Sequence, residues 1–183
     1  IPVVQINEYL EPSPMAQAEW VKFFGALFLK EKEAASYFDR ISEAYTHLCS
    51  VTDTLNLRPE VLLNLPWKGS WYVPGGKSNI AQLIEDAGGK YIWFENDEKH
   101  NMPLSIEDVF LEASNADIWL NPGQANSIQD IVYTDKRLKE FSPLKKSNVY
   151  NRNKRMSEKG GNDSMESGIV RPDLMLKDLI YIL

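Results

Sequence analysis

The stretch WYVPGGKSNIAQLIEDAGGKYIW, residues 71–93, holds an aromatic strand-forming run, a double-glycine turn, a short helical pattern and a second strand-forming run. This order predicts a β-α-β unit with an unusual loop. Gly75 and Gly76 let the backbone turn tightly and approach other atoms closely. The same small region holds aromatic rings and hydrogen-bond donors, from Trp71, Tyr72, Lys77 and Asn79. A loop of this composition is typical of a binding cleft.

Gly76-Lys77-Ser78 is similar to the end of a phosphate-binding P-loop, but two other parts of that motif are missing. The motif requires a glycine five positions before Gly76, where this chain has Trp71, whose ring would fill the space of the phosphates. The aspartate expected after a later apolar strand is also missing, because in ADIWLNPG the acid, Asp117, precedes the apolar residues. These differences exclude a nucleotide-binding P-loop.

The size, charge and cysteine content of the chain exclude several classes of protein. With 183 residues and 43% hydrophobic content, the chain is long enough for one domain with a sizeable core. No apolar run reaches the length needed to span a membrane. The net charge of -6 argues against nucleic acid as a partner. The single cysteine, Cys49, has no partner for an internal disulfide or a metal site and is expected to be a small apolar residue of a helix.

Both ends of the chain lie inside structured patterns. The strand-like IPVVQI begins at Ile1, and an apolar helical pattern continues up to Leu183. We therefore expect a fragment of a longer protein, so that the lack of a signal peptide says nothing about the compartment.

From Ser13 to Leu48, apolar residues recur at the three-and-four spacing of one helical face. Ser13 is suited to the N-cap and Pro14 to the first helical position. As one helix, this segment has about 35 residues and a length of about 50 Å, enough to cross a domain or join two. The alternative is an ordinary core helix with a break near Gly25 or Glu31.

Strands and helices alternate along the rest of the chain, which indicates an α/β layered domain. Ser105-x-x-Asp108 and Ser127-x-x-Asp130 mark two helix starts. A polar, glycine-containing loop is expected at 153–168. The expected strands lie near 60–65, 70–73, 91–94, 117–120 and 148–151. The expected helices lie at 79–87, 105–114 and from 172 onward, with a helix pair at 127–141.

In this order, the long helix and the segments WYVPGGKSNIAQLIEDAGG, ADIWLNPG, NVYNRN and GGNDSMESGIVRPDLMLKDLI resemble one known family. They look like the C-terminal lobe of an ABC-importer solute-binding protein of the iron-siderophore, haem or cobalamin type, in which one long helix joins two lobes. The resemblance covers nearly the whole chain. It implies a three-layer α/β/α Rossmann-like lobe with a long N-terminal connecting helix. Residues 1–12 would end the N-terminal lobe, 13–50 would form the inter-lobe helix, and 51–183 the ligand-binding lobe.

The resemblance also implies a function. A protein of this kind is periplasmic or otherwise extracytoplasmic, is often lipid-anchored, and delivers its ligand to an ABC permease in the membrane. The expected ligand is an iron-siderophore, haem or a corrinoid such as cobalamin. We expect a monomer with no cofactor of its own and no nucleic-acid partner.

Within the resemblance, loops at the strand ends face the ligand cleft and supply the binding residues. Aromatic rings would stack on planar or catecholate groups, and Lys77 and Arg152 would pair with carboxylate or catecholate oxygens. Of the basic residues Lys145, Lys146, Arg152, Lys154 and Arg155, we select Arg152 because NVYNRN ends a predicted strand. The full set is Trp71, Tyr72, Lys77, Asn121, Gly123, Arg152, Asn162, Asp163 and Glu166.

Each aromatic candidate has a plainer alternative. Trp71 and Tyr72 could be half-buried strand residues, as probable a role for an aromatic in a strand as ligand contact. Gly123, the glycine among the candidates, also has an alternative, because a glycine is more often a turn residue than a ligand contact. Tyr72 as an axial ligand of haem iron is a further alternative.

Glu85, in LIEDAGG, is the candidate for permease docking. Helical periodicity buries Ile80, Leu83, Ile84 and Ala87 and leaves Glu85 towards solvent. The resemblance implies that a glutamate at this place on each lobe binds arginines of the permease, where charge pairs set orientation. A solubilising surface acid is the alternative.

The sequence offers no catalytic set. It has no nucleophile elbow and no Cys-His pairing, and neither His47 nor His100 has a neighbour at metal-ligand spacing. Glu85 and Asp86 are adjacent on a helix and point in different directions. We therefore expect neither catalytic residues nor a metal site. The competing class is a free-standing α/β enzyme domain acting on a small molecule, whose long helix serves as a dimerisation arm.

Overall fold

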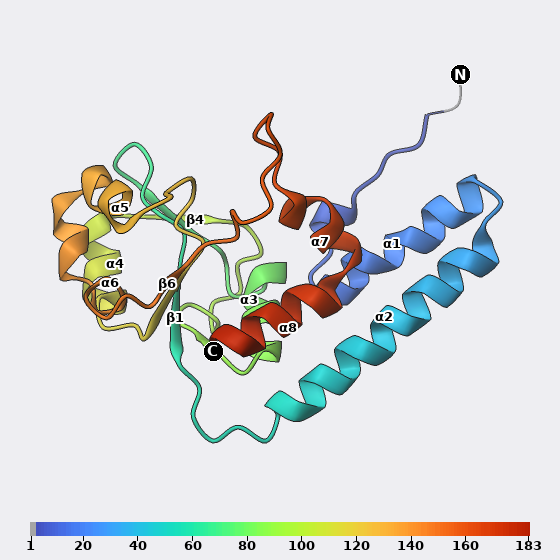
Figure 1. Cartoon of the computed structure of the whole chain (residues 1–183), viewed down its shortest axis with the longest axis horizontal. Coiled ribbons are helices and arrows are strands. Elements are labelled where there is room, and N and C mark those ends of the chain that lie inside the picture. The colour runs from blue at the N-terminus through green and yellow to red at the C-terminus, as the bar shows by residue number, and fades with distance from the viewer. Residues whose placement is uncertain (1–2) are drawn as a thin grey trace.

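Four short strands form the central parallel sheet of the protein, whose computed structural model describes residues 3–183 (Figure 1). The strands lie in the order β3-β1-β5-β6 and span, in that order, Lys90–Tyr91, Glu60–Leu63, Ile118–Leu120 and Val149–Tyr150. The apolar runs VLL of β1 and IWL of β5 are wholly buried, as expected for parallel strands covered on both faces. The predicted α/β class is confirmed.

Alternate residues of β1 face two different helical layers. Leu62 packs into a cluster formed with α4 (Ile106–Ala113), α5 (Ile128–Thr134), α6 (Ser142–Lys145) and the 3₁₀ helix η2 (Lys136–Glu140). Val61 and Leu63 face the opposite layer, formed by α3 (Asn79–Asp86) and α8 (Pro172–Ile182). The three-layer α/β/α arrangement thus follows from the period-two alternation of one buried strand.

The predicted β-α-β unit at 71–93 is wrong in one respect, because its first strand belongs to another sheet. β2 (Trp71–Val73) pairs antiparallel with β4 (Met102–Leu104), a strand that the sequence did not predict. A tight turn at Lys68 and Gly69, both with positive φ, reverses the chain after β1. β2 therefore lies outside the parallel sheet, and α3 belongs to the crossover between the parallel strands β1 and β3.

The segment expected to form one helix at 13–50 is two helices. α1 (Pro14–Leu27) has the predicted Ser13 cap and ends before Leu29, whose φ is 56°, and α2 (Glu31–Thr52) folds back along it. A Cβ at Gly25 would overlap that of Ala34, so glycine permits this close approach. The continuous helix was wrong and the alternative with a break is right. α2 alone is about 33 Å long at 1.5 Å per residue.

α2 is joined to the α/β layers through Asp86, the last residue of α3. Tyr45 Oη donates to Asp86 Oδ2 (2.5 Å), and Thr52 Oγ1 donates to the Asp86 carbonyl (2.6 Å). Burial and the neighbouring carboxylate raise the pKa of Tyr45, so its hydroxyl keeps the proton that it donates. These bonds fix the orientation of α2 against the lobe.

The helix starts predicted at Ser105 and Ser127 are confirmed, while β3 and the segment 153–168 differ from the prediction in detail. Ser105 and Ser127 cap α4 and α5, and Ser105 forms a full capping box with Asp108. β3 is shorter than expected because the chain turns where Phe94 N donates to Tyr91 O. The expected loop at 153–168 also contains short helical turns, and the remaining elements are η1 (Glu8–Leu10), η3 (Asp163–Met165) and α7 (Ser167–Val170).

Candidate functional site

The carboxyl ends of β1, β5 and β6 lead into loops at one edge of the sheet, the usual place for ligands in open α/β folds. Asn64 and Asn121 follow β1 and β5 directly, and both have left-handed φ, at 65° and 55°. Asn151, just after β6, donates from its amide to the carbonyls of Gly123 and Ala125 (both 2.9 Å). Hydrogen bonds therefore hold the β5 and β6 loops side by side.

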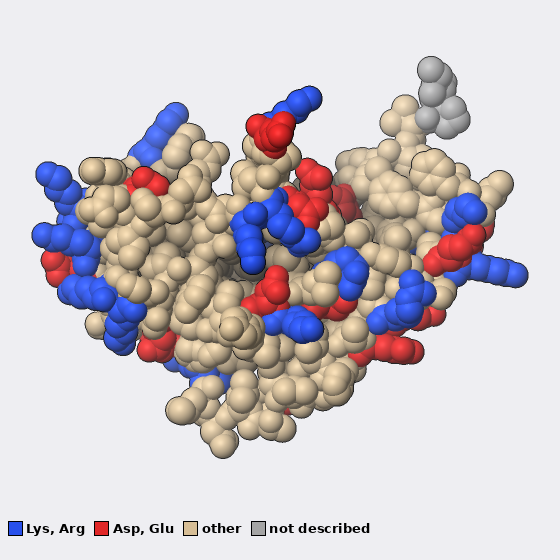
Figure 2. All heavy atoms as spheres, viewed as in Figure 1, with Lys and Arg blue, Asp and Glu red and all other residues tan. Residues whose placement is uncertain are grey.

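Two adjoining hollows open next to this edge. The first, of about 510 Å³, lies between the N-terminal segment 9–14, the glycine loop, residues 99–101 and the start of α8. The second, of about 550 Å³, lies between the ends of β5 and β6 and α8. The residues that line both are Ile80, Leu83, Arg152 and Met175. Near the middle of the face shown in Figure 2, Lys and Arg side chains lie next to Asp and Glu side chains.

Arg152 lies where the two hollows meet. Its guanidinium forms no ion pair or hydrogen bond with any residue in 3–183, although its backbone N–H donates to Asn151 Oδ1 (2.9 Å). Partial burial lowers the pKa of Arg152, because removal from water disfavours the charged form. The structure thus places a cation without a counter-charge in the candidate site.

Four other predicted residues lie at the same edge. Lys77 is exposed, lines the first hollow, and holds its ammonium 5.1 Å from the centroid of the Phe94 ring. Asn121 lines the second hollow, and Gly123, with φ of 59°, lines a third of about 580 Å³ on the other side of the β5 loop. Tyr72 is 40% exposed and alternates with buried neighbours in β2.

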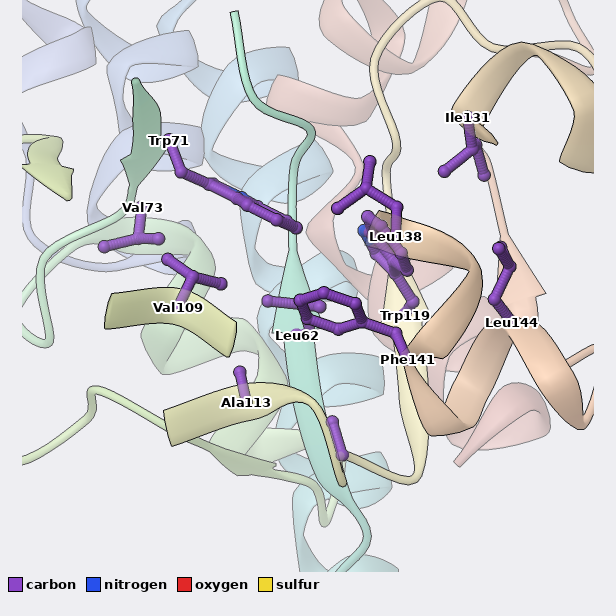
Figure 3. Close-up of a cluster of buried hydrophobic side chains, with 11 residues drawn as sticks. Leu62, Trp71, Val73, Val109, Ala113, Trp119, Ile131, Leu138, Phe141 and Leu144 are labelled. Atoms are coloured by element: carbon purple, nitrogen blue, oxygen red, sulfur yellow. The ribbon is translucent and has the colours of Figure 1, made fainter. Parts of the chain in front are cut away.

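Trp71 is wrong as a ligand-binding residue, and the alternative of strand packing is right. Its side chain is 0% exposed, and its indole N–H donates to the Leu63 carbonyl (2.9 Å). Figure 3 shows the ring pointing toward Leu62, Trp119 and Phe141 in the core. In a strand, neighbouring side chains point to opposite faces, so Tyr72 faces out because Trp71 faces in.

Asn162, Asp163 and Glu166 lie in the segment that follows β6, part of which stands out from the molecule (Figure 1). Asn162 caps η3 by accepting from Ser164 N (3.0 Å), and Asp163 pairs with Arg155 (3.0 Å). Glu166 is exposed. Asn162 and Asp163 therefore bond within their own segment, while Ser164, which was not predicted, lines the second hollow.

Trp67 was missed by the sequence prediction. Its side chain is 61% exposed at the edge of the third hollow, with the Lys68 ammonium 4.4 Å from its ring centroid. The available signal was the Lys68-Gly69 pair between two strands, a combination suited to a tight turn that exposes the residues beside it. Lys99 and His100, which line the first hollow, were also missed.

Glu85 does not face solvent as predicted. Its side chain is 13% exposed, Oε2 pairs with Arg58 (2.9 Å) and Oε1 accepts the Tyr91 N–H (3.0 Å). The carboxylate therefore joins α3 to β3 and to the segment before β1. The predicted solvent-facing position of Glu85 is therefore wrong, and its role in permease docking stays a prediction.

Replacing Glu85 with arginine should lower the free energy of unfolding by about 1–2 kcal/mol, because the Tyr91 N–H loses its acceptor and Arg58 faces a like charge. The measurement is urea unfolding followed by circular dichroism. Glu43→Arg, at an exposed position on α2, is the matched control. Equal stability of the two variants would show that the Glu85 contacts contribute nothing.

The glycine loop does not present its amides to a ligand. Gly75 N donates to His100 O, Gly76 N to Asn96 Oδ1 and Lys77 N to Glu98 O, at 2.9–3.0 Å. Three successive amides are thus bonded to residues 96–100, in agreement with the rejection of a P-loop.

Neither cysteine chemistry nor a metal centre is built into the described part of the chain. Burial raises the pKa of the Cys49 thiol to about 11, so little thiolate forms at neutral pH. Among residues 3–183, no group of three or more His, Cys, Asp or Glu side chains is placed to hold a metal ion. In the same range, no helix combines the length and apolar character required to span a bilayer.

Relatives of this chain were found by sequence. An uncharacterized lipoprotein of Methanocaldococcus jannaschii is 25% identical over 179 residues, which cover 96% of this chain and 41% of the relative. An uncharacterized protein of the same organism is 24% identical over 155 residues, covering 82% of this chain and 46% of the relative. The chain therefore spans less than half the length of these relatives.

Solved structures share the fold. One described as a possible iron-binding, periplasmic solute-binding protein of Staphylococcus epidermidis has a TM-score of 0.70 at 19% identity, covering 94% of this chain and 63% of that one. S. aureus IsdE complexed with heme has a TM-score of 0.69 at 20% identity, and the match covers 93% of this chain and 65% of IsdE. The sequence model described as periplasmic binding protein matches residues 4–155. On this match, the chain belongs to the periplasmic binding protein family.

Proposed function

We propose that this chain forms the C-terminal lobe of an extracytoplasmic, lipid-anchored binding protein that carries an iron chelate, haem or a corrinoid to an ABC permease. The observation that carries the proposal is the pair of adjoining hollows at the carboxyl edge of the parallel sheet, with Arg152 between them. Their size is in the range of small-molecule sites. The iron- and heme-binding descriptions of S. epidermidis and S. aureus proteins with this fold support the ligand class.

The residues proposed to contact ligand come from the loops at this edge. Tyr72 and Trp67 would offer ring faces, Lys77 and Arg152 cationic donors, and Asn121 an amide. Loops on a rigid sheet can vary in sequence without disturbing the core, which suits them to ligand binding. Delivery to a permease rests on the family alone, and Glu85, which is engaged within the lobe, stays only a predicted docking residue.

Titration of the full-length protein with a ferric siderophore, haem and cobalamin, followed by tryptophan fluorescence, tests the proposal. At least one of these ligands should bind at micromolar concentration or below and change the emission. Trp67→Phe should reduce that change where the ligand reaches the third hollow, at which Trp67 is exposed, whereas Trp71 is buried. Absence of binding to all three ligands by fluorescence and by calorimetry would contradict the proposed ligand class.

A further inference from the structure

An apolar groove lies between α4 and η2, on the face of the sheet opposite α3 and α8. It encloses about 590 Å³ and shares no lining residue with either of the two hollows at the candidate site. One wall is formed by Ile106, Phe110 and Leu111 of α4, and the other by long side chains of η2 whose aliphatic stems can cover apolar surface. The groove lies at the end of the lobe away from α2 (Figure 1).

The α4 wall presents apolar side chains to water. Leu111 is 81% exposed and Phe110 is 37% exposed. The Phe110 ring packs edge-on against the buried Phe141 ring, with 5.4 Å between centroids, so the groove is held in shape by the core beneath it. Single exposed apolar residues are common, but two that border an apolar groove are typical of an interaction surface.

The two walls of the groove carry opposite charge. α4 holds three exposed acidic residues and no basic one, Glu107, Asp108 and Glu112. Residues 136–146, which form η2 and α6, hold five Lys or Arg residues and one acidic residue, Glu140. Lys and Arg side chains gather at the left end of Figure 2, where Figure 1 places α6. We call α4 the acidic wall and residues 136–146 the basic wall.

Both walls keep charge that a partner can use. Arg137 pairs with Glu107 of the acidic wall and with Asp135 (2.7 Å). The Glu107 and Arg137 side chains are 66% and 52% exposed, and ion pairs at such positions are weak and can exchange partners. Lys136 and Lys146 form no ion pair within residues 3–183.

This arrangement of charge selects the kind of partner. A uniformly anionic surface, such as a membrane, would attract the basic wall but repel the acidic wall. A partner that is acidic on one side and basic on the other matches both, and a second copy of this chain has that pattern. Rotation by 180° about an axis along the groove places each acidic wall opposite the other copy's basic wall. It also buries the Leu111 side chain of each copy in the shared groove.

We propose that two copies of this protein associate through the groove as a two-fold symmetric dimer, with each acidic wall on the basic wall of the other copy. This goes beyond the proposed function and takes the place of the monomer expected from the resemblance. The candidate ligand site lies on the other side of the sheet and stays open in the dimer. Because the groove is small, the dissociation constant of the dimer should be about 10–500 μM.

Sedimentation equilibrium of the full-length protein, from about 1 μM to 1 mM, tests the dimer. Leu111→Asp should weaken association at least about 10-fold, because a charge replaces an apolar contact at the centre of the interface in both copies. Leu57→Asp is the matched control, since Leu57 is 87% exposed and does not line the groove, and it should leave the constant unchanged. About 0.5 M salt should weaken association of the wild type.

Charge reversal tests the pairing of the walls. The variant Glu107→Lys/Glu112→Gln removes the net charge of the acidic wall, and its glutamine can still accept the Trp93 indole N–H. The variant Lys136→Glu/Lys139→Glu removes the net charge of the basic wall. Each should self-associate at least about 10-fold more weakly than the wild type. An equal mixture of the two should associate at least about 3-fold more tightly than either alone, because one acidic wall then meets one intact basic wall.

Far-ultraviolet circular dichroism should show that every variant is folded. Monomers at all concentrations would overturn the inference, as would a dimer that Leu111→Asp leaves unchanged. Failure of the mixture to associate more tightly than its components would overturn the two-fold pairing of the walls. Monomers that instead bind vesicles of anionic lipid, with binding lost in Leu111→Asp, would overturn the dimer in favour of a membrane contact.

Discussion

Replacing Gly76 with alanine is expected to lower the free energy of unfolding by about 3 kcal/mol or more, the upper range for over-packing a buried position. A Cβ there would overlap the carbonyl oxygen of Phe94 and lie 2.5 Å from those of Trp93 and Asn96. All three neighbours are backbone atoms, which cannot rotate away as a flexible side chain can. Gly75 has the same surroundings, with the carbonyls of Glu98 and His100 in the way.

The segment 93–100 cannot simply move to make room. It accepts hydrogen bonds from three successive amides of the glycine loop, and β4 follows it directly. Shifting it would break those bonds and leave buried amides without acceptors, which adds about 1–3 kcal/mol for each such group.

Gly160→Ala is the control for Gly76→Ala. Gly160 has a φ of +84° but no other atoms within 4 Å of an added Cβ, so its substitution tests backbone conformation alone and should cost about 1 kcal/mol. Urea unfolding of both variants gives the comparison. If the Gly76→Ala protein is as stable as the Gly160→Ala protein, residues 93–100 can move away from the added Cβ at a lower free-energy cost than their hydrogen bonds suggest.

The sequence predicted elements that depend on local chemistry. Ser105 and Ser127 start helices because their side chains accept N–H groups three residues later, a pattern contained within four residues. The buried runs of β1 and β5 were recognised for the same reason, as short apolar segments between turn residues. These patterns can be recognised in the sequence without knowing which residues pack against them.

The errors in the fold depend on contacts between distant residues. Periodicity continued through residues 28–30, but the chain reverses there because Gly25 and Ala34 can approach closely. Similarly, the composition of residues 71–73 predicts a strand but does not indicate the sheet to which it belongs. In the structure the chain turns after β1, and residues 71–73 pair with residues 102–104. Which strand pairs with which is not a local property.

The candidate site was predicted in part for the same reason. Arg152 and Asn121 follow strands and Lys77 follows the two glycines of the glycine loop, and the structure places all three beside the hollows. Glu85 was misplaced because helical periodicity puts it on the solvent side of α3, while Arg58 and the Tyr91 N–H cover it from outside the helix. Periodicity describes one helix and cannot show what lies next to it.

Trp71, which was predicted to contact ligand, is buried, whereas Trp67, which the sequence prediction missed, is exposed, so replacing each should have very different consequences. Trp71→Ala should lower the free energy of unfolding by about 3–5 kcal/mol, as for other buried aromatic residues replaced by alanine. The ring lies 5.4 Å from Trp119 and 5.7 Å from Phe141, between centroids, and its loss would also leave the Leu63 carbonyl without the indole donor.

Trp67→Ala is the matched control, since the same atoms are removed from a side chain that is 61% exposed. It should change the stability by less than about 1 kcal/mol, the usual limit for a surface position away from special contacts, and act instead on ligand binding. Near-ultraviolet circular dichroism provides a second measurement, because the packed rings of Trp71, Trp119 and Phe141 should produce a signal that only Trp71→Ala abolishes. A Trp71→Ala protein as stable as Trp67→Ala would mean that this three-ring cluster is not the packed centre of the lobe, and Trp71 would again be a candidate for ligand contact.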